Sequence, residues 1–209
     1  MAKIMTRNVA DISGSYATGS LILGASGNTA TTTRPGRLGQ ALSFDGTNDY
    51  VSVANIVPLR VSTGPVAAWA FRNDATNGKQ YVIFNYPRVS NPSAAAYLLY
   101  AYDDSNQLIL YLDNTAALAY TFGASAKHAK RWVHYAATWD GSIVSLYGDG
   151  KLVATTTQTA TLTYTNPAAP RIGDDDSTSH QFRGSLDDVR VYNRAITAAE
   201  AKRLYDMGK

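Results

Sequence analysis

The sequence contains no cysteine, and Glu200 is the only glutamate among its 16 acidic residues. Without cysteine the chain can form neither disulfides nor thiolate metal sites, so packing must stabilise the fold. A β-sandwich that hydrolyses a polysaccharide normally places two carboxyl groups on either side of the scissile bond, one of them an acid of raised pKa. No glutamate pair exists to do this, and we therefore predict a protein that is not an enzyme.

Long apolar runs and basic stripes are also missing. No stretch approaches the roughly 20 apolar residues that cross a membrane, and residues 1–11 lack the apolar run of a classical signal peptide. The 19 basic residues are scattered, and the formal net charge is only +3. We therefore expect no membrane insertion and no nucleic-acid partner. The location stays open, with an extracellular surface or a virion as the suspected setting.

Short apolar runs separated by Gly, Asn, Asp and Pro are typical of an antiparallel all-β protein. At 209 residues and 45% hydrophobic content, at least ten such runs predict one domain of two stacked sheets. Asp-Gly pairs at 140–141 and 149–150 are predicted two-residue turns of a three-stranded meander over 132–157. The expected strands cover residues 41–44, 50–53, 66–72, 80–86, 96–102, 108–112, 132–139, 143–148, 151–156 and 186–192.

One helix is predicted, at the C-terminal end. Thr197 and Glu200 have the spacing of a capping box, in which each side chain accepts a hydrogen bond from the backbone of the other residue. Ala201, Leu204 and Tyr205 would share one helix face, and a glycine at position 208 supplies the stop. This pattern assigns Glu200 a structural role rather than a catalytic one.

Three segments carry a family signature. Residues 39–51 read GQALSFDGTNDYV, residues 132–153 contain the Trp-rich meander with its Asp-Gly turns, and residues 182–196 read FRGSLDDVRVYNRAI before the helix. Together they resemble laminin-G-like jelly rolls of the concanavalin A-like lectin/glucanase superfamily. The resemblance implies an all-β, two-sheet antiparallel jelly-roll sandwich with a short C-terminal helix over residues 36–209. Residues 1–35, low in pattern, are expected to form an N-terminal arm or edge segment.

Members of this family are mostly non-catalytic recognition modules, and the chain lacks the Glu-x-Asp-x-x-Glu strand of the superfamily's glucanases. The resemblance therefore implies a lectin-like adhesion module that binds glycans or a protein partner at a cell or virion surface. The alternative is a structural assembly protein, such as a virus capsid decoration or spike component, acting as a homo-oligomer or in a capsid-type assembly. A polysaccharide-cleaving enzyme comes third.

Superfamily members often bind calcium, so the resemblance also implies a structural Ca²⁺ ion, whose ligands would be loop carboxylates and amides. The candidate ligands are Asp45, Asn48, Asp49 and Asp187. In the competing interpretation, the first three hold a loop through Asx turns and Asp187 accepts backbone N–H groups under a sheet edge. Both stay open. The run of three aspartates at 174–176 could hold an ion as well, but we favour a solvated loop.

A sugar site needs an aromatic ring to stack on the apolar sugar face and a few polar groups to fix the hydroxyls. The chain has 14 Tyr and 3 Trp, with many tyrosines in its middle third. The same rings could instead fill the core or a subunit contact. The three histidines look isolated and are expected to be surface or partly packed residues. The candidate ligand-binding residues are Tyr86, Arg88, Tyr100, Tyr102 and Arg72.

Overall fold

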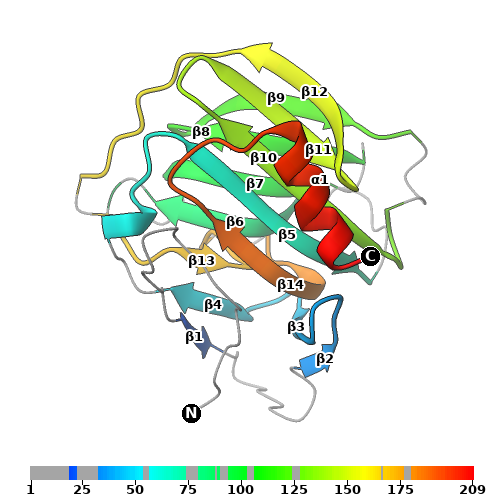
Figure 1. Ribbon diagram of the computed structural model, residues 1–209. Coiled ribbons are helices and arrows are strands. Elements are labelled where there is room, and N and C mark those ends of the chain that lie inside the picture. The colour runs from blue at the N-terminus through cyan, green and yellow to red at the C-terminus, as the bar shows by residue number, and fades with distance from the viewer. Residues whose placement is uncertain are drawn as a thin grey trace.

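The computed structural model describes residues 19–22, 33–53, 57–73, 80–87, 89, 94–102, 106–123, 128–165, 167–176 and 180–209. In these residues, fourteen strands form two antiparallel seven-stranded sheets, and an α-helix follows the last strand (Figure 1). The predicted class, an antiparallel two-sheet jelly-roll sandwich with a short C-terminal helix, is confirmed. None of the described helices is long and apolar enough to cross a membrane.

Sheet A lies at the back of Figure 1 and has the strand order β1-β4-β13-β6-β7-β8-β9. Its central strands β6, β7 and β8 form a meander, and the short β13 joins them to β4. The strands are β1 (Gly19–Ile22), β4 (Tyr50–Val53), β13 (Arg171–Ile172), β6 (Gln80–Pro87), β7 (Ala95–Tyr102), β8 (Gln107–Leu112) and β9 (Thr115–Thr121).

Sheet B lies in front and has the order β12-β11-β10-β5-β14-β3-β2. The predicted meander over residues 132–157 forms one half of this sheet, and β14 lies between β5 and β3. The strands are β12 (Lys151–Thr157), β11 (Ile143–Gly148), β10 (Trp132–Trp139), β5 (Gly64–Arg72), β14 (Arg183–Val191), β3 (Gln40–Asp45) and β2 (Thr33–Pro35).

All ten predicted strands are present, and the structure has four more. Among those four, β1 and β2 are edge strands of sheets A and B, and β9 is the opposite edge of sheet A. The fourth, β13, is only two residues long. β2 is exposed throughout and β13 is too short for alternation to show, so neither gives a clear signal in the sequence. β9, with the sequence TAALAYT, has apolar residues that the prediction did not assign to a strand.

Of the two predicted hairpin turns, the second lies at the predicted residues and the first lies one residue later. Asp149 and Gly150 form the two-residue turn between β11 and β12, both with positive φ (48° and 73°). In the first hairpin the N–H of Asp140 instead donates to the carbonyl of Ile143, so the turn residues are Gly141 and Ser142, one position later than predicted. The Asp140 carboxylate accepts the N–H groups of Ile143 and Ser142, which lowers its pKa. A side-chain acceptor thus closes this turn, an Asx-type arrangement.

The main core fills the space between the sheets with aliphatic and aromatic side chains from both. The buried Tyr97 ring stacks on those of Phe84 and Tyr86, with centroids 5.6 and 5.3 Å apart. Its hydroxyl donates to the carbonyl of Leu59 (2.8 Å), beside the short 3₁₀ helix η2 (Val57–Leu59). Burial raises the pKa of Tyr97 well above its usual value. The buried tyrosines thus act as core residues whose polar ends find backbone acceptors.

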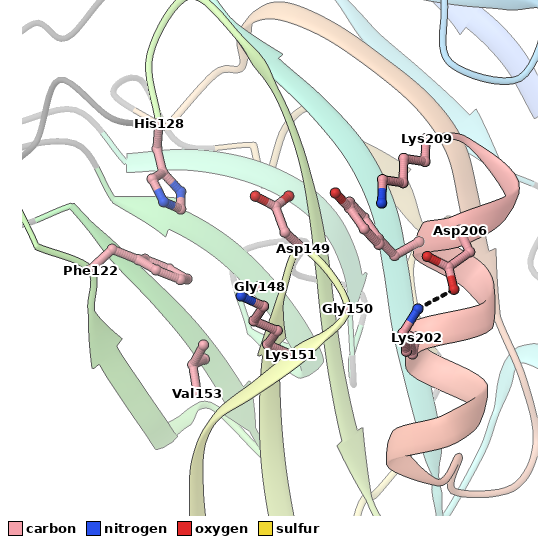
Figure 2. A pocket seen from close by; sticks show the side chains of 11 residues that line it. Phe122, His128, Gly148, Asp149, Gly150, Lys151, Val153, Lys202, Asp206 and Lys209 are labelled. Atoms are coloured by element: carbon pink, nitrogen blue, oxygen red, sulfur yellow. Dashed lines mark hydrogen bonds and ion pairs between the residues drawn. The ribbon is translucent and has the colours of Figure 1, made fainter.

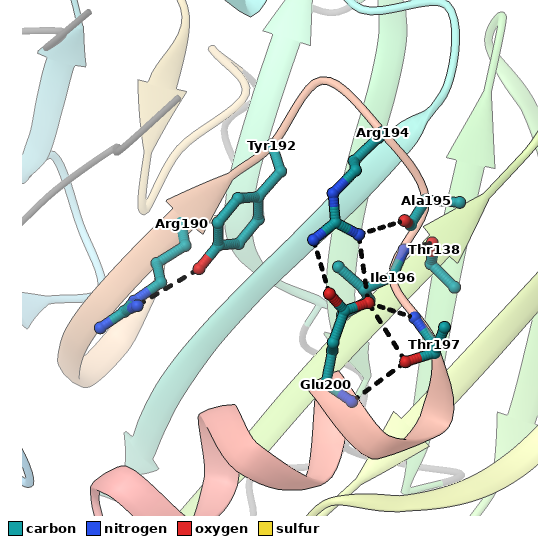
Figure 3. Close-up of polar contacts among 8 residues, drawn as sticks. All are labelled: Thr138, Arg190, Tyr192, Arg194, Ala195, Ile196, Thr197 and Glu200. Atoms are coloured by element: carbon teal, nitrogen blue, oxygen red, sulfur yellow. Dashed lines mark hydrogen bonds and ion pairs between the residues drawn. The ribbon is translucent and has the colours of Figure 1, made fainter. Parts of the chain in front are cut away.

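The C-terminal helix α1 (Ala198–Met207) lies on the outer face of sheet B, where Ala201 and Leu204 pack on small side chains of β5 and β10. Its N-terminus has the predicted capping box between Thr197 and Glu200. Glu200 also binds Arg194 through both carboxylate oxygens, at 2.5 and 3.1 Å (Figure 3). The Arg194 bonds, with the Thr197 N–H, lower the pKa of Glu200 to about 2. The single glutamate therefore has a structural role at the N-terminus of α1.

Candidate functional site

The outer face of sheet A carries apolar and aromatic side chains where an exposed sheet face normally carries polar ones. Val82, Leu98 and Tyr100 form a buried cluster on this face, and the partly exposed Ile109 and Tyr111 pack against it. Alternation places them there: Tyr100 pairs with Ile109 and Leu98 pairs with Tyr111 across β7 and β8. The exposed margin of the cluster is therefore a surface with aromatic and aliphatic character.

Tyr100 stands at the centre of this surface and is fixed by polar partners. Its hydroxyl donates to Oδ2 of Asp175 (2.5 Å), which also lies 2.8 Å from Nδ1 of His180. The rings of Tyr111 and His180 each lie 5.5 Å from the Tyr100 ring, both edge-on. Burial, followed by the Asp175 charge, raises the pKa of Tyr100 far above its usual value. The phenol is held protonated, so it cannot serve as a general base.

Arg171 on β13 borders the same face. Its guanidinium binds Asp174 (2.5 Å) and Asp176 (2.6 Å) and lies over the Tyr50 ring, 4.3 Å from the centroid. With Asp175 bound to Tyr100 and His180, each aspartate of the 174–176 run has a protein partner. The solvated loop that we favoured for this run is therefore wrong for Asp174 and Asp175, which are buried.

The structure divides the five predicted ligand-binding residues among different regions. Tyr100 and the partly exposed Tyr102 share the outer face of sheet A, two residues apart on β7. Tyr86 is fully buried in the core between the sheets. Arg72, 1% exposed at the end of β5, donates to the Asn106 side chain (3.4 Å). Arg88 lies outside the described residues. The four described residues therefore do not form one site, and the buried Tyr86 and Arg72 cannot contact a ligand at the surface.

Asp45, Asn48 and Asp49 lie together in the turn between β3 and β4. Asp45 Oδ1 accepts the N–H groups of Thr47 (2.7 Å) and Asn48 (3.2 Å), and Asp49 Oδ2 accepts the N–H of Asp45 (3.0 Å). These contacts close the turn through side-chain acceptors, the arrangement of an Asx turn.

Asp187 lies away from that turn. Arg183 faces Asp45 across β14 and β3, so Asp187 is four residues farther along β14, about 13 Å away. Its Oδ2 accepts the N–H groups of Arg37 and Leu38, both at 2.7 Å. Calcium ligands lie about 2.3–2.6 Å from the ion, so one ion cannot contact all four predicted ligands. Within the described part of the chain, no three His, Asp or Glu side chains gather as metal ligands would. The four residues do not fit a single calcium site.

The histidines are more deeply packed and better connected than expected. His134 is 1% exposed on β10, and His128 is 7% exposed with its Nδ1 3.0 Å from the Tyr135 hydroxyl. His180 joins Asp175 and Tyr100, a contact between segments 80 residues apart. Sequence spacing gave no signal for that contact, because only the fold brings β7 beside the loop that follows β13.

Comparisons with known proteins agree with this architecture. The family model described as the concanavalin A-like lectin/glucanases superfamily, laminin G type 3, matches residues 45–202. The chain belongs to this family, as its sequence segments indicated. No curated protein matches the sequence.

Several solved structures share the fold at low sequence identity. Domain 4 of AbnA, a GH43 extracellular arabinanase from Geobacillus stearothermophilus solved with arabinotriose, has a TM-score of 0.66 at 16% identity, covering 99% of this chain and 96% of that one. The heptameric SAP-like pentraxin from Limulus polyphemus has a TM-score of 0.64 at 16% identity, covering 78% and 80%. The receptor-binding domain of botulinum neurotoxin D has a TM-score of 0.60 at 13% identity, and this chain, covered to 90%, spans about half (48%) of it. At these identities the likeness concerns the fold.

Proposed function

We propose that this domain is a non-catalytic recognition module that binds saccharide chains on the outer face of sheet A. The observation that supports the proposal is the partly exposed aromatic and aliphatic surface of Tyr102, Ile109 and Tyr111 beside fixed polar side chains. A tyrosine ring can stack on the apolar face of a sugar, while nearby polar groups orient the hydroxyls. The likeness to an arabinanase domain solved with arabinotriose supports a saccharide as ligand.

His180 supplies an oriented polar group at the edge of that surface. Its Nδ1 faces the Asp175 carboxylate at 2.8 Å, and its side chain is 26% exposed. A histidine held through one ring nitrogen offers the other to a ligand. The Tyr100 hydroxyl binds the same Asp175 carboxylate and so fixes it. The His180 imidazole is therefore in position before a sugar binds. Such preorganisation reduces the entropy that binding must overcome.

The chemistry of the described residues supports binding rather than cleavage. A retaining or inverting hydrolase needs two free carboxyl groups that flank one bond. Glu200 is held by Arg194 and the helix cap, and Asp174 and Asp176 hold Arg171. Asp175, bound to Tyr100 and His180, is buried. Each of these carboxylates is already bound by another residue of the protein, and a substrate would have to compete with that residue for the carboxylate oxygens.

The test is affinity electrophoresis of the purified chain through gels that contain neutral polysaccharides, such as arabinan, xylan or β-glucan. We expect retardation by at least one of them. Replacing Tyr111 by Ala removes a stacking ring, worth about 1.4 kcal/mol, and weakens binding roughly tenfold. Ile109→Ala also weakens it, whereas the matched control Ile143→Ala, at a 48% exposed position on sheet B, leaves it unchanged. Equal retardation of all three variants would place the saccharide elsewhere, and no retardation on any polysaccharide would refute the proposal.

A further inference from the structure

A cavity of about 500 Å³ lies beside α1, away from the outer face of sheet A (Figure 2). One wall is formed by the β11–β12 turn and the first residues of β12. Residues that follow β9 and residues from α1 to the end of the chain form the other walls. A volume of this size falls within the range of about 300–1,000 Å³ that is typical of small-molecule sites. The cavity is therefore large enough for one or two sugar units.

Small residues in the turn let aromatic side chains form the walls. A Cβ added at Gly148 would lie 2.6 Å from the ring of Phe122, and one at Gly150 would lie 2.9 Å from Tyr205 Cβ. The His128 ring packs on Phe122, with centroids 4.2 Å apart. Aromatic side chains therefore flank the β11–β12 turn on both sides, and their contacts with the turn glycines and with one another fix their positions.

Both carboxylates that line the cavity already have cationic partners. Asp206 forms an ion pair with Lys202, one helical turn earlier in α1. Asp149 binds Arg131 at 3.0 Å and accepts the N–H of His134, also at 3.0 Å. Neither carboxylate therefore leaves an uncompensated negative charge in the cavity.

Two further lysines line the cavity without such partners. Neither Lys151 nor Lys209 forms an ion pair with any residue that the structure describes. Figure 2 shows Lys209 on the side of α1 and Lys151 across from it, near Gly148. The charges cancel within each ion pair, and Arg131, the partner of Asp149, lies outside the lining, so the three lysines and two aspartates that line the cavity carry a net charge of +1. A concave, partly apolar wall strengthens the attraction of such charges for an anion.

We propose that this cavity binds an anionic saccharide unit, either a hexuronate or a sulfated sugar. The aromatic walls fit the apolar face of a sugar ring, and Lys151 and Lys209 can each donate to a carboxylate or sulfate oxygen. The family to which the chain belongs is named for lectins and glucanases, which favours a saccharide over other anions of this size. The site is separate from the outer face of sheet A, so the chain has two saccharide-binding surfaces with different charge preferences.

The experiment is isothermal titration of the full chain at low salt with three probes. These are a trigalacturonate, the same trisaccharide with its carboxylates reduced to alcohols, and a sulfated trisaccharide. We expect binding of at least one anionic probe and at least tenfold weaker binding of the reduced one. The double variant Lys151→Gln and Lys209→Gln should lose at least tenfold in affinity. Arg203→Gln removes one positive charge from an exposed position of α1 outside the cavity and should leave the affinity within twofold.

Several outcomes would overturn the assignment. Equal binding of the anionic and reduced probes would show that charge is not recognised, and an unchanged affinity in the double lysine variant would place the anion elsewhere. Competition by a nucleoside diphosphate at the same concentration would assign the cavity to anions other than saccharides. Tyr111→Ala should not affect this titration, so failure here and failure of the neutral-polysaccharide test are distinguishable.

Discussion

His134 makes the stability of the domain depend on pH in a way that can be calculated. The ring is 1% exposed and lies 5.2 Å from the Trp69 ring and 6.3 Å from the Tyr205 ring, and its Nδ1 has no hydrogen-bond partner among the residues that the structure describes. Burial, assisted by the charge of Arg190 and opposed by that of Asp149, lowers the pKa of His134 from 6.5 to about 4. The folded protein therefore holds this imidazole in its neutral form.

The sign and the size of the effect follow from linkage. Between pH 6.5 and pH 4 the unfolded chain binds a proton at His134 that the folded chain does not, so the free energy of unfolding falls as the pH falls. Above pH 6.5 the His134 imidazole is mostly neutral in the unfolded chain as well, so this contribution to the free energy of unfolding is fully present there. At pH 5, pKa values of 6.5 and about 4 correspond to a loss of about 2 kcal/mol.

The measurement is urea unfolding, followed by tryptophan fluorescence, at pH 7.5 and pH 5 for the natural chain and for His134→Phe. Phenylalanine keeps an aromatic ring beside the stacked rings of Trp69 and Tyr205 and loses no hydrogen bond at the Nδ1 position. Carboxylates titrate in both proteins, so their contribution cancels in the comparison. We expect the natural chain to lose about 2 kcal/mol more than the variant over this interval. Parallel losses in the two proteins would refute the reasoning.

Four further substitutions should change stability to different extents, measured as free energies of unfolding in urea at pH 7.5. Tyr100→Phe removes a buried bond to a carboxylate and should cost about 1.5–3 kcal/mol, whereas Tyr111→Phe, on the partly exposed neighbour, should cost less than about 0.5 kcal/mol. Thr197→Ala removes the helix cap and should cost about 1 kcal/mol, and no loss would contradict the capping role. Gly184→Ala should cost at least about 2 kcal/mol, because φ is 146° and a Cβ would lie 2.0 Å from the Phe71 carbonyl oxygen.

The strands and the helix could be predicted from the sequence because their signals are local. Alternation in β10, Gly at turn positions and the capping box of α1 each depend on residues a few positions apart. The turn after β10 lies one residue later than predicted, because Asp140 precedes the turn: its backbone N–H donates to the Ile143 carbonyl, and its carboxylate also accepts the N–H groups of Ser142 and Ile143. A side-chain acceptor of this kind cannot be distinguished from a turn residue by sequence spacing alone.

The candidate site was harder to predict because alternation does not say which face of a strand meets the core. A register shift between Val82 and Phe84 interrupts the alternation of β6, so both Ile83 and Phe84 point into the core. Tyr86 therefore lies inside, while Tyr100 on the neighbouring strand faces outward. The partners of Tyr100 come from a loop about 75 residues away in sequence, beyond the reach of any local pattern.

The position of α1 accounts for where ligands can approach this sandwich. The helix packs on β5, β10 and β11 through Ala201 and Leu204, and this covers the middle of the outer face of sheet B. The cavity with Lys151 and Lys209 lies at the margin of the helix. Among the described residues no α-helix covers sheet A. If α1 determines where ligands approach, Leu204→Ala, which removes part of the contact between the helix and sheet B, should weaken the titrated binding of the anionic probes at the cavity more than the retardation by neutral polysaccharides that depends on Tyr111.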